Sequence, residues 1–460
     1  MTASSGSTIQ PPGHQGRWPY LLGLWLLAFV LLPNIPFVLV RMVTTFNQAP
    51  FAMLYALIGT MVGLMGWSIV PALLMALAFA FNLTLLISEF FGLDLRDALE
   101  QAHLILELNP LTEPLYVAGV IGCLASLGAT IFVIHRQFER LRRLSPWLGM
   151  VTVMLLPVPL TLVSGKVHSL NGELRDWAGY LWENGLAGDD GAPETVVSAV
   201  TRSGFAGDRA IAERRHLVLV VVEAMGMLDD PAADAAVFGG ETGHLRISRG
   251  VIPYEGSTTA AEMRELCGTT ESFRAIRDQA RSGAGCLPAR LRDLGYRTSG
   301  LHGMTEMFYD RQRWWPEVGL DDVRFLEDLK DEPGLGLCGG VFTGICDQDL
   351  VATIFSRVRG AAGPQFIYWL TLNSHIPVSA EVTRETGCDK APAPFATDRV
   401  CTLGRMWAGI IEKLAKGLAE PGLPPMDVLI VGDHAPPLFL PSDRRQFQPD
   451  VVPWVLLQTP

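Results

Sequence analysis

His216-Leu217-Val218-Leu219-Val220-Val221-Val222-Glu223 is a continuous apolar run that ends in a single carboxylate. Such a run is typical of a strand buried on both faces of a parallel sheet. The pattern of the residues that follow predicts further strands at 296–301, 366–372, 427–431 and 451–458, and helices at 287–294 and 412–418. Because strands alternate with helices, the sequence predicts an α/β domain with a mostly parallel central sheet.

Side chains that can bind a metal or a proton follow these strands where each strand ends. They are Glu223, His302, His375, Asp433 and His434. The carboxyl edge of an open α/β sheet is where ligands bind. Any one of these residues alone is more often a hydrogen-bonded structural residue, so the hypothesis depends on the set. A mixture of carboxylate and imidazole ligands indicates a divalent-metal site.

A second stretch supplies a hydroxyl group for this edge. In Tyr254-Glu255-Gly256-Ser257-Thr258-Thr259-Ala260-Ala261-Glu262, the glycine favours a tight turn, Thr258 follows it, and a helix is predicted from Thr259 to Leu266. The N-terminus of a helix carries unpaired N–H groups and attracts anions such as phosphate. The alternative interpretation is an ordinary helix cap, for which serine and threonine are common.

The chain has 460 residues, of which 49% are hydrophobic, and most of the apolar surplus lies in residues 19–164. A bilayer is crossed by about 20 apolar residues in a helix. The apolar runs predict five transmembrane helices, at 20–40, 51–67, 69–91, 115–135 and 146–163. Residues 1–18 form a polar tail that does not resemble a cleavable signal peptide. Residues 93–108 and 176–182 are predicted to be helices that lie on the membrane surface.

The loop charges predict the orientation of these helices. Arg136, Arg140, Arg142 and Arg143 lie between the fourth and fifth helices, which places that loop in the cytoplasm. The acidic loop at 92–114 is then extracytoplasmic, as is everything after residue 165. We therefore expect four parts: a cytoplasmic tail (1–18), a five-helix membrane domain (19–164), a periplasmic connector (165–213) and a catalytic domain (214–460).

The cysteines agree with an exported domain. Six of the seven lie after residue 213, at positions 267, 286, 338, 346, 388 and 401. An even number in an exported domain favours disulfides, and six cysteines allow 15 pairings. Consecutive pairing closes short loops and is the expected arrangement, although some cysteines can be free buried thiols. The net charge of −11 argues against a nucleic-acid partner.

Several motifs together resemble one family. They are Val221-Val222-Glu223-Ala224-Met225-Gly226, Gly256-Ser257-Thr258-Thr259-Ala260-Ala261-Glu262, Leu301-His302-Gly303, Phe308-Tyr309-Asp310-Arg311, Thr371-Leu372-Asn373-Ser374-His375-Ile376-Pro377 and Gly432-Asp433-His434-Ala435-Pro436-Pro437. Their order and spacing resemble the alkaline-phosphatase/sulfatase superfamily. More narrowly, they resemble its membrane-anchored branch, which contains the lipoteichoic acid synthases and the phosphoglycerol and phosphoethanolamine transferases.

The resemblance implies a role for each matching residue. Glu223, Thr258, Asp433 and His434 would ligate one divalent metal ion, zinc or manganese, and Thr258 would be the catalytic nucleophile. Positions His302, Tyr309, Arg311 and His375 would surround the phosphate and the head group of the substrate. Tyr309 stands where the synthases carry tryptophan, and Met304 stands where they carry a polar residue against glycerol. The cysteines at 338 and 346 are closer to the phosphoethanolamine transferases, so the head group stays open.

The implied activity is transfer of phosphoglycerol or phosphoethanolamine from a phospholipid to an envelope glycan or glycolipid. It proceeds through a covalent phosphothreonine, in a multi-pass protein of the bacterial inner membrane. One alternative is a hydrolase or phosphodiesterase that uses the same metal site with water as acceptor. A second is a sulfatase, because Cys286-Leu287-Pro288-Ala289-Arg290 fits the C-x-P-x-R pattern that is converted to formylglycine in sulfatases. A third is a membrane protein whose domain binds a ligand without catalysis.

Overall fold

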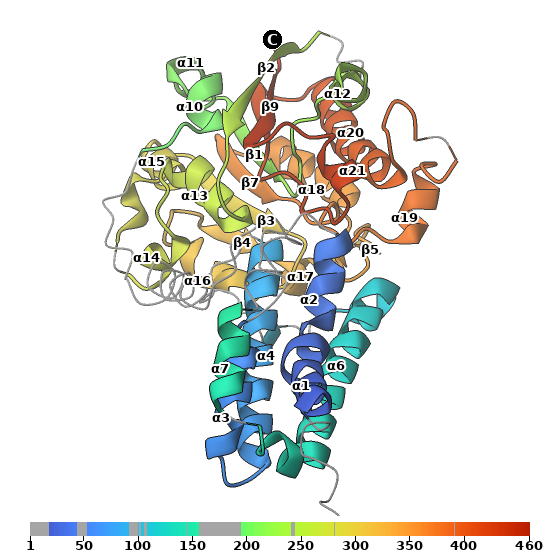
Figure 1. The fold of residues 1–460 in the computed structure, drawn as a ribbon. Coiled ribbons are helices and arrows are strands. Elements are labelled where there is room, and N and C mark those ends of the chain that lie inside the picture. The colour runs from blue at the N-terminus through green and yellow to red at the C-terminus, as the bar shows by residue number, and fades with distance from the viewer. Residues whose placement is uncertain are drawn as a thin grey trace, which may run out of the picture. The chain divides into compact units, whose positions relative to one another are not determined.

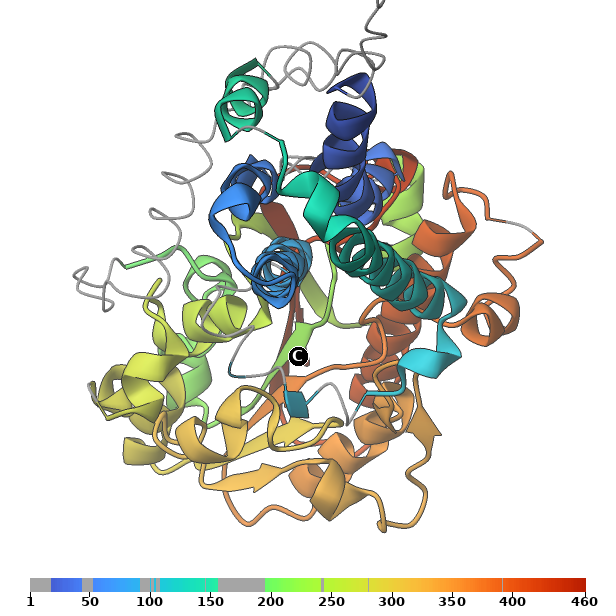
Figure 2. The ribbon, with the colours of Figure 1, turned by 60° about the horizontal axis from the view of Figure 1, so that its bottom comes forward.

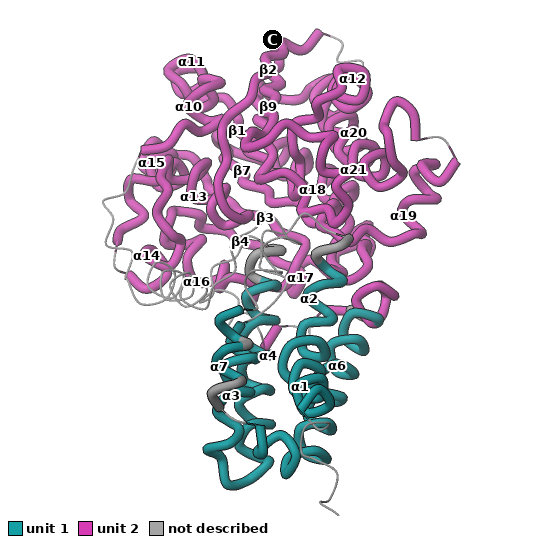
Figure 3. Tube along the Cα trace, viewed as in Figure 1, with its two compact units in different colours: residues 1–87, 118–183 teal, residues 88–117, 184–460 magenta. Residues whose placement is uncertain are grey.

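The computed structural model describes residues 18–43, 53–91, 100, 103–104, 108–144, 146–155, 195–240, 244–279, 281–390 and 392–460. The chain divides into two compact units, which Figure 3 distinguishes by colour. One comprises residues 1–87 and 118–183, and the other comprises residues 88–117 and 184–460. The first is made of apolar helices, and the second is built on a β-sheet.

The apolar helices can be followed in Figure 1 and, closer to end-on, in Figure 2. They are α1 (Trp18–Leu26), a π-helical turn at Leu27–Leu31, α2 (Leu32–Val43), α3 (Met53–Met61), a 3-10 turn at Val62–Leu64, α4 (Ile69–Phe91), α6 (Pro114–Leu141) and α7 (Pro146–Leu155). Three stretches are long and apolar enough to cross a membrane: Trp18–Val40, Ile69–Ile87 and Pro114–Leu141. The structure therefore confirms three of the five predicted helices as apolar helices of spanning length.

The other two predicted spans are not confirmed. The helix Met53–Leu64 is shorter than a membrane span, and it is separated from α4 by the predicted break at residues 66–68. Of the predicted helix at 146–163, the described part is the ten-residue α7. Both spans stay predictions, as does the orientation of the helices.

Close contacts hold the helices of this unit together. A Cβ atom at Gly59 of α3 would lie 2.6 Å from Cγ of Phe29, so only glycine permits this approach. Two buried polar side chains also pair with each other, since Asn82 Nδ2 donates to Tyr55 Oη at 2.9 Å. The pairing satisfies polar groups that would be costly to bury alone.

The second unit contains a seven-stranded sheet in the order β2-β9-β8-β1-β7-β3-β4. The strands are β1 (His216–Val222), β2 (Arg246–Pro253), β3 (Arg297–His302), β4 (Asp322–Arg324), β7 (Gln365–Leu370), β8 (Met426–Gly432) and β9 (Val451–Gln458). Strands β8, β1, β7, β3 and β4 are parallel to one another, whereas β9 is antiparallel to both β8 and β2. The sheet is thus mixed, and its parallel part contains all the strands that carry predicted site residues.

Helices cover both faces of this sheet (Figure 1). On one face, Leu217, Leu219 and Val221 of β1 belong to a buried cluster with residues of α13 (Thr258–Cys267), α14 (Phe273–Arg277), α15 (Leu287–Asp293) and α16 (Arg311–Trp314). The other face is covered by α12 (Pro231–Phe238), α18 (Asp347–Arg359) and α20 (Asp398–Leu418). Burial on both faces explains why β1, β7 and β8 are continuously apolar.

The remaining α-helices and strands are short. They are α10 (Ala199–Ser203), α11 (Asp208–Ala212), α17 (Leu326–Leu329), α19 (Ala380–Glu385), α21 (Pro441–Arg444), and the two-stranded hairpin of β5 (Leu337–Cys338) and β6 (Gly344–Ile345). Strands β2 and β4 were not predicted. The reason is that β2 is an edge strand whose residues are mostly exposed, and β4 has three residues.

The disulfides follow the predicted consecutive pairing. Cys267 pairs with Cys286, Cys338 with Cys346, and Cys388 with Cys401. Each bridge closes a short loop, of 19, 8 and 13 residues in sequence separation. The seventh cysteine, Cys123, is free and lies in α6.

Several predictions fall outside the described residues. They concern residues 1–17 of the tail, residues 165–194 of the connector, the helix at 176–182 and most of the helix at 93–108. The described end of the connector, residues 195–213, contains α10 and α11. The predicted boundaries between the four parts of the chain stay predictions.

Candidate active site and metal centre

The site lies where parallel strands β8 and β1 end side by side. Val222 of β1 is in register with Gly432 of β8, so Glu223 and Asp433 are the next residues along two adjacent strands. His302 ends β3, and His375 follows β7, which pairs with both β1 and β3. The strand order therefore brings the predicted residues to one edge of the sheet, as the sequence indicates.

Thr258 enters this edge from α13. Gly256 has φ +73°, a conformation that glycine adopts without strain, and the turn places Thr258 at the first position of the helix. The Thr258 hydroxyl oxygen lies 3.2 Å from Glu223 Oε2, 3.0 Å from Asp433 Oδ2 and 3.3 Å from His434 Nε2. The structure thus gathers all four predicted ligands around one point.

These separations suit a single ion. Ligands about 2.1 Å from a tetrahedral metal lie about 3.4 Å from one another. One ligand atom from each of Glu223, Asp433 and His434 lies within 4.8 Å of the other two. Two carboxylates, an imidazole and a hydroxyl form a donor set that zinc and manganese both accept.

Backbone groups fix the orientation of the ligands. Asp433 Oδ1 accepts the N–H groups of Ala224 at 2.7 Å and of His434 at 2.6 Å, which turns Oδ2 toward Thr258. Ala224 has φ +54°, a strained conformation for alanine, and this conformation aims its N–H at Asp433. His434 Nδ1 donates to the carbonyl oxygen of Ala435 at 3.0 Å, which turns Nε2 toward Thr258.

The charges of this cluster favour a cation. Glu223 and Asp433 are 5% and 1% exposed. Burial raises the pKa of Glu223 well above its ordinary value, and the neighbouring charge of Asp433 raises it further. Two buried carboxylates beside the His434 imidazole are an arrangement that a bound divalent ion stabilises, so these residues fit the predicted metal.

Two further predicted histidines lie at the same edge of the sheet. His375 Nε2 lies 4.0 Å from Glu223 Oε1, and its Nδ1 contacts the carbonyl oxygen of Ile376 at 2.8 Å. His302 Nδ1 contacts the carbonyl oxygen of Leu370 at 3.0 Å. Burial lowers the pKa of His375 to about 4 and that of His302 well below its ordinary value. Both rings are therefore neutral, with the proton on Nδ1.

The side chain of Arg311 is buried. Its Nε and Nη2 donate to Glu262 Oε2 at 3.1 and 2.9 Å. The guanidinium carbon lies 5.1 Å from the centroid of the Tyr309 ring, which places the two predicted substrate-binding residues against each other. The positive charge of Arg311 adds to the effect of burial in lowering the pKa of His302, and it opposes the effect of burial that raises the pKa of Glu223.

Two carboxylates that support the site were not predicted. Glu262, one helical turn after Thr258, also accepts from Trp315 Nε1 at 2.9 Å and from the Tyr368 hydroxyl at 3.2 Å. Asp347 accepts the backbone N–H groups of Leu372 and Asn373, and thereby holds the loop that carries His375. Glu262 lies in the quoted threonine motif, which is the available sequence signal for it, whereas Asp347 has no motif around it.

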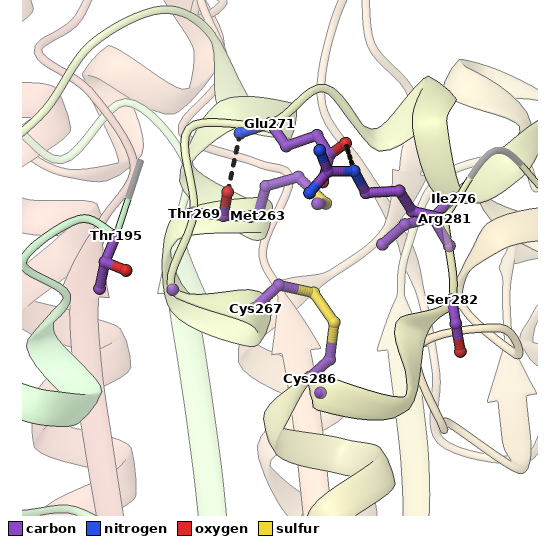
Figure 4. Close-up of a pocket in the computed structure, with 11 residues that line it drawn as sticks. Thr195, Met263, Cys267, Thr269, Glu271, Ile276, Arg281, Ser282 and Cys286 are labelled. Atoms are coloured by element: carbon purple, nitrogen blue, oxygen red, sulfur yellow. Dashed lines mark hydrogen bonds and ion pairs between the residues drawn. A yellow bond between two sulfur atoms is a disulfide. The ribbon is translucent and has the colours of Figure 1, made fainter. Parts of the chain in front are cut away.

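A separate pocket lies at the other end of α13. Its volume is about 240 Å³, and it is lined by the Cys267–Cys286 disulfide and by the Glu271–Arg281 ion pair (Figure 4). A ten-residue helix is about 15 Å long. Since Cys267 ends α13 and Thr258 begins it, Cys286 is held far from the metal ligands and its sulfur is occupied in a disulfide.

Residues 254–447 match the protein-family model described as Sulfatase, so the chain contains a sulfatase-family domain. Lipoteichoic acid synthase LtaP from Listeria monocytogenes is similar in structure, with 16% identity, 57% of this chain and 68% of that chain covered, and a TM-score of 0.40. Phosphoglycerol transferase GacH from Streptococcus pyogenes, in complex with sn-glycerol-1-phosphate, has 13% identity, coverage of 58% and 78%, and a TM-score of 0.39. The C-terminal periplasmic domain of EcEptC from Escherichia coli has 13% identity, coverage of 54% and 73%, and a TM-score of 0.34. No curated protein matches the chain.

Proposed function

We propose that this chain, with its sulfatase-family domain at residues 254–447, transfers a phospho-alcohol head group from a phospholipid to an envelope glycan or glycolipid. The observation that carries the proposal is the position of Thr258, whose hydroxyl lies within 3.3 Å of Glu223, Asp433 and His434 at the start of a helix. A hydroxyl in such surroundings is suited to nucleophilic attack on phosphorus.

The proposed metal would be held by Glu223, Thr258, Asp433 and His434. Such an ion lowers the pKa of a hydroxyl that it touches and offsets the negative charge of a phosphoryl group. The first N–H groups of α13 point toward the same place and add partial positive charge. The positive charge of Arg311 acts on Glu223, and Glu262 holds the guanidinium in place.

The reaction has two halves. In the first, a bond forms between Thr258 Oγ1 and phosphorus, and the bond from phosphorus to the diacylglycerol oxygen breaks. In the second, an acceptor hydroxyl attacks the phosphothreonine and frees Thr258. His302 and His375 are neutral, so in the first half either can take the proton of the Thr258 hydroxyl and give it to the diacylglycerol oxygen, and in the second half either can take the proton of the acceptor hydroxyl and return it to Thr258.

A membrane location supports a lipid donor. Three apolar helices are long enough to span a bilayer. Three disulfides in the second unit favour an oxidising compartment, which agrees with a catalytic domain outside the cytoplasm of a bacterial inner-membrane protein. The partners in this proposal are the membrane, the phospholipid donor and the glycan acceptor, with phosphoglycerol and phosphoethanolamine as the two head groups to be distinguished.

The sulfatase alternative is disfavoured by Cys286. Formylglycine formation requires a free thiol at a catalytic position, whereas Cys286 is 4% exposed and bonded to Cys267. The first residue of α13, which lies in the metal cluster, is Thr258 and not a cysteine.

The test is the mass of the intact protein after incubation with phosphatidylglycerol or phosphatidylethanolamine. We expect one added phospho-alcohol, located at Thr258 by peptide mapping, with one lipid and not with the other. Thr258→Ala should gain no mass, and a diacylglycerol product should appear only with the wild-type chain. Release of head group without any modified acceptor would favour the hydrolase, and absence of an adduct with both lipids would contradict the proposal.

A further inference from the structure

The ring of His375 is packed against a phenylalanine from a distant part of the chain. Phe342 and His375 have ring centroids 3.8 Å apart with an interplanar angle of 41°. The backbone contact of His375 Nδ1 is to its own neighbour, Ile376. That contact lies within the loop, whereas the ring of Phe342 constrains His375 from a different segment of the chain.

Phe342 lies at the tip of a closed hairpin, residues 337–346. Strands β5 and β6 pair in antiparallel fashion, and the Cys338–Cys346 disulfide joins them. Gly339 has φ +101°, and a Cβ atom there would clash with the carbonyl oxygen of Phe342. The glycine is thus required for the tip to close, and the closed tip sets the position of Phe342.

The hairpin is also attached on two sides. Ile345 donates its N–H to the carbonyl oxygen of Gly303 at 2.9 Å, next to His302. Asn109 donates its N–H to the carbonyl oxygen of Val341 at 3.0 Å. The hairpin is therefore fixed between the end of β3 and the segment that precedes α6.

We propose that Phe342 is a positioning residue for His375, and that the hairpin 337–346 holds Phe342 in the position that this role requires. The inference rests on the proposed function, because His375 matters only if it handles a proton in phosphoryl transfer. Phe342 itself takes no part in bond making. It keeps the imidazole ring oriented so that Nε2 faces Glu223 and the reacting groups.

The enzymatic test compares four variants of the full-length protein, with release of diacylglycerol from a fluorescent phospholipid in detergent micelles as the assay. Phe342→Ala should lower kcat about 10- to 100-fold, the effect of a misplaced catalytic group, with KM for the lipid unchanged. Phe342→Tyr keeps the ring and should restore kcat to within about twofold of the wild type, as an unstrained conservative change does. Leu337→Ala, in the same hairpin but 62% exposed, is the matched control and should behave as the wild type.

Gly339→Ala tests the hairpin without touching the ring pair. It should lower kcat as Phe342→Ala does, and the double variant should show no further loss, because both changes remove one constraint. Additive losses, or an unchanged kcat in Phe342→Ala, would overturn the inference.

A second measurement separates this inference from the proposed function. Diethyl pyrocarbonate modifies neutral imidazole, and peptide mapping reports its rate at His375. The rate should rise in Phe342→Ala and Gly339→Ala, and stay at the wild-type value in Phe342→Tyr and Leu337→Ala. An unchanged rate in Phe342→Ala refutes the positioning role. If the wild type forms no adduct at Thr258, the proposed function fails and the reactivity of His375 alone decides this inference.

Discussion

Substitution of Glu262 by glutamine should strongly destabilise the protein. Glu262 is completely buried and accepts hydrogen bonds from Arg311, Trp315 and Tyr368. Arg311 is 3% exposed and loses its countercharge in the variant. Removing one partner of a buried pair costs about 3–5 kcal/mol, because the remaining charge stays buried without compensation.

This free energy can be converted to a melting temperature. For a domain of this size, 1 kcal/mol corresponds to about 2–4 °C, so Glu262→Gln should lower the apparent Tm by about 6–20 °C. The measurement is a thermal scan of the full-length protein in detergent at a fixed scan rate. Glu412→Gln removes the partner of Lys416 in an exposed pair on α20, and is the matched control with an expected shift below about 2 °C.

The double variant Glu262→Gln with Arg311→Gln tests whether the loss of stability comes from the unpaired charge of Arg311. It removes both charges, so it should be less destabilised than Glu262→Gln alone. A Tm for Glu262→Gln equal to that of Glu412→Gln would refute the claim that this buried pair supports the helix that carries Thr258.

Three further predictions concern the metal, a disulfide and pH. Asp433→Asn should lower the metal content per chain at least about 10-fold, measured by mass spectrometry of the purified protein, since Asn can keep Oδ1 as the acceptor of the two backbone N–H groups but replaces the charged oxygen that faces Thr258 by an NH2 group; wild-type metal content in the variant would argue against the centre. Replacement of Cys388 and Cys401 by alanine opens a short loop and should cost about 3 kcal/mol, seen as a lower Tm; an unchanged Tm would mean that this bridge adds no stability. Burial raises the pKa of Asp347 to about 7, so its contribution to stability is complete below about pH 4 and is lost as the pH rises through about 7. The wild-type Tm should therefore fall relative to that of Asp347→Asn between pH 5 and pH 8, and a constant difference would contradict this assignment.

The central strands and the ligands at their ends could be predicted because their signals are local. The apolar run that ends at Glu223 and the run that ends at Asp433 are each read from a few consecutive residues. Parallel neighbours then bring their ends to one edge without further information. The consecutive disulfides could be predicted for the same reason, since each closes a short loop.

What could not be predicted depends on contacts between residues distant in sequence. The Glu262–Arg311 pair joins positions 49 residues apart, and neither residue differs in type from an ordinary surface charge. Phe342 meets His375 only because a hairpin and a strand end lie beside each other. Strand β2 was missed because an exposed edge strand with arginine and serine lacks the alternation that indicates a strand.

Anomalous diffraction from crystals of the full-length protein loaded with Mn²⁺ or Zn²⁺ tests the central claim most directly. The account predicts one peak per chain, about 2.0–2.3 Å from ligand atoms of Glu223, Asp433 and His434 and from the Thr258 hydroxyl oxygen. A metal bound elsewhere, or one at this edge that leaves Thr258 beyond bonding distance, would contradict it.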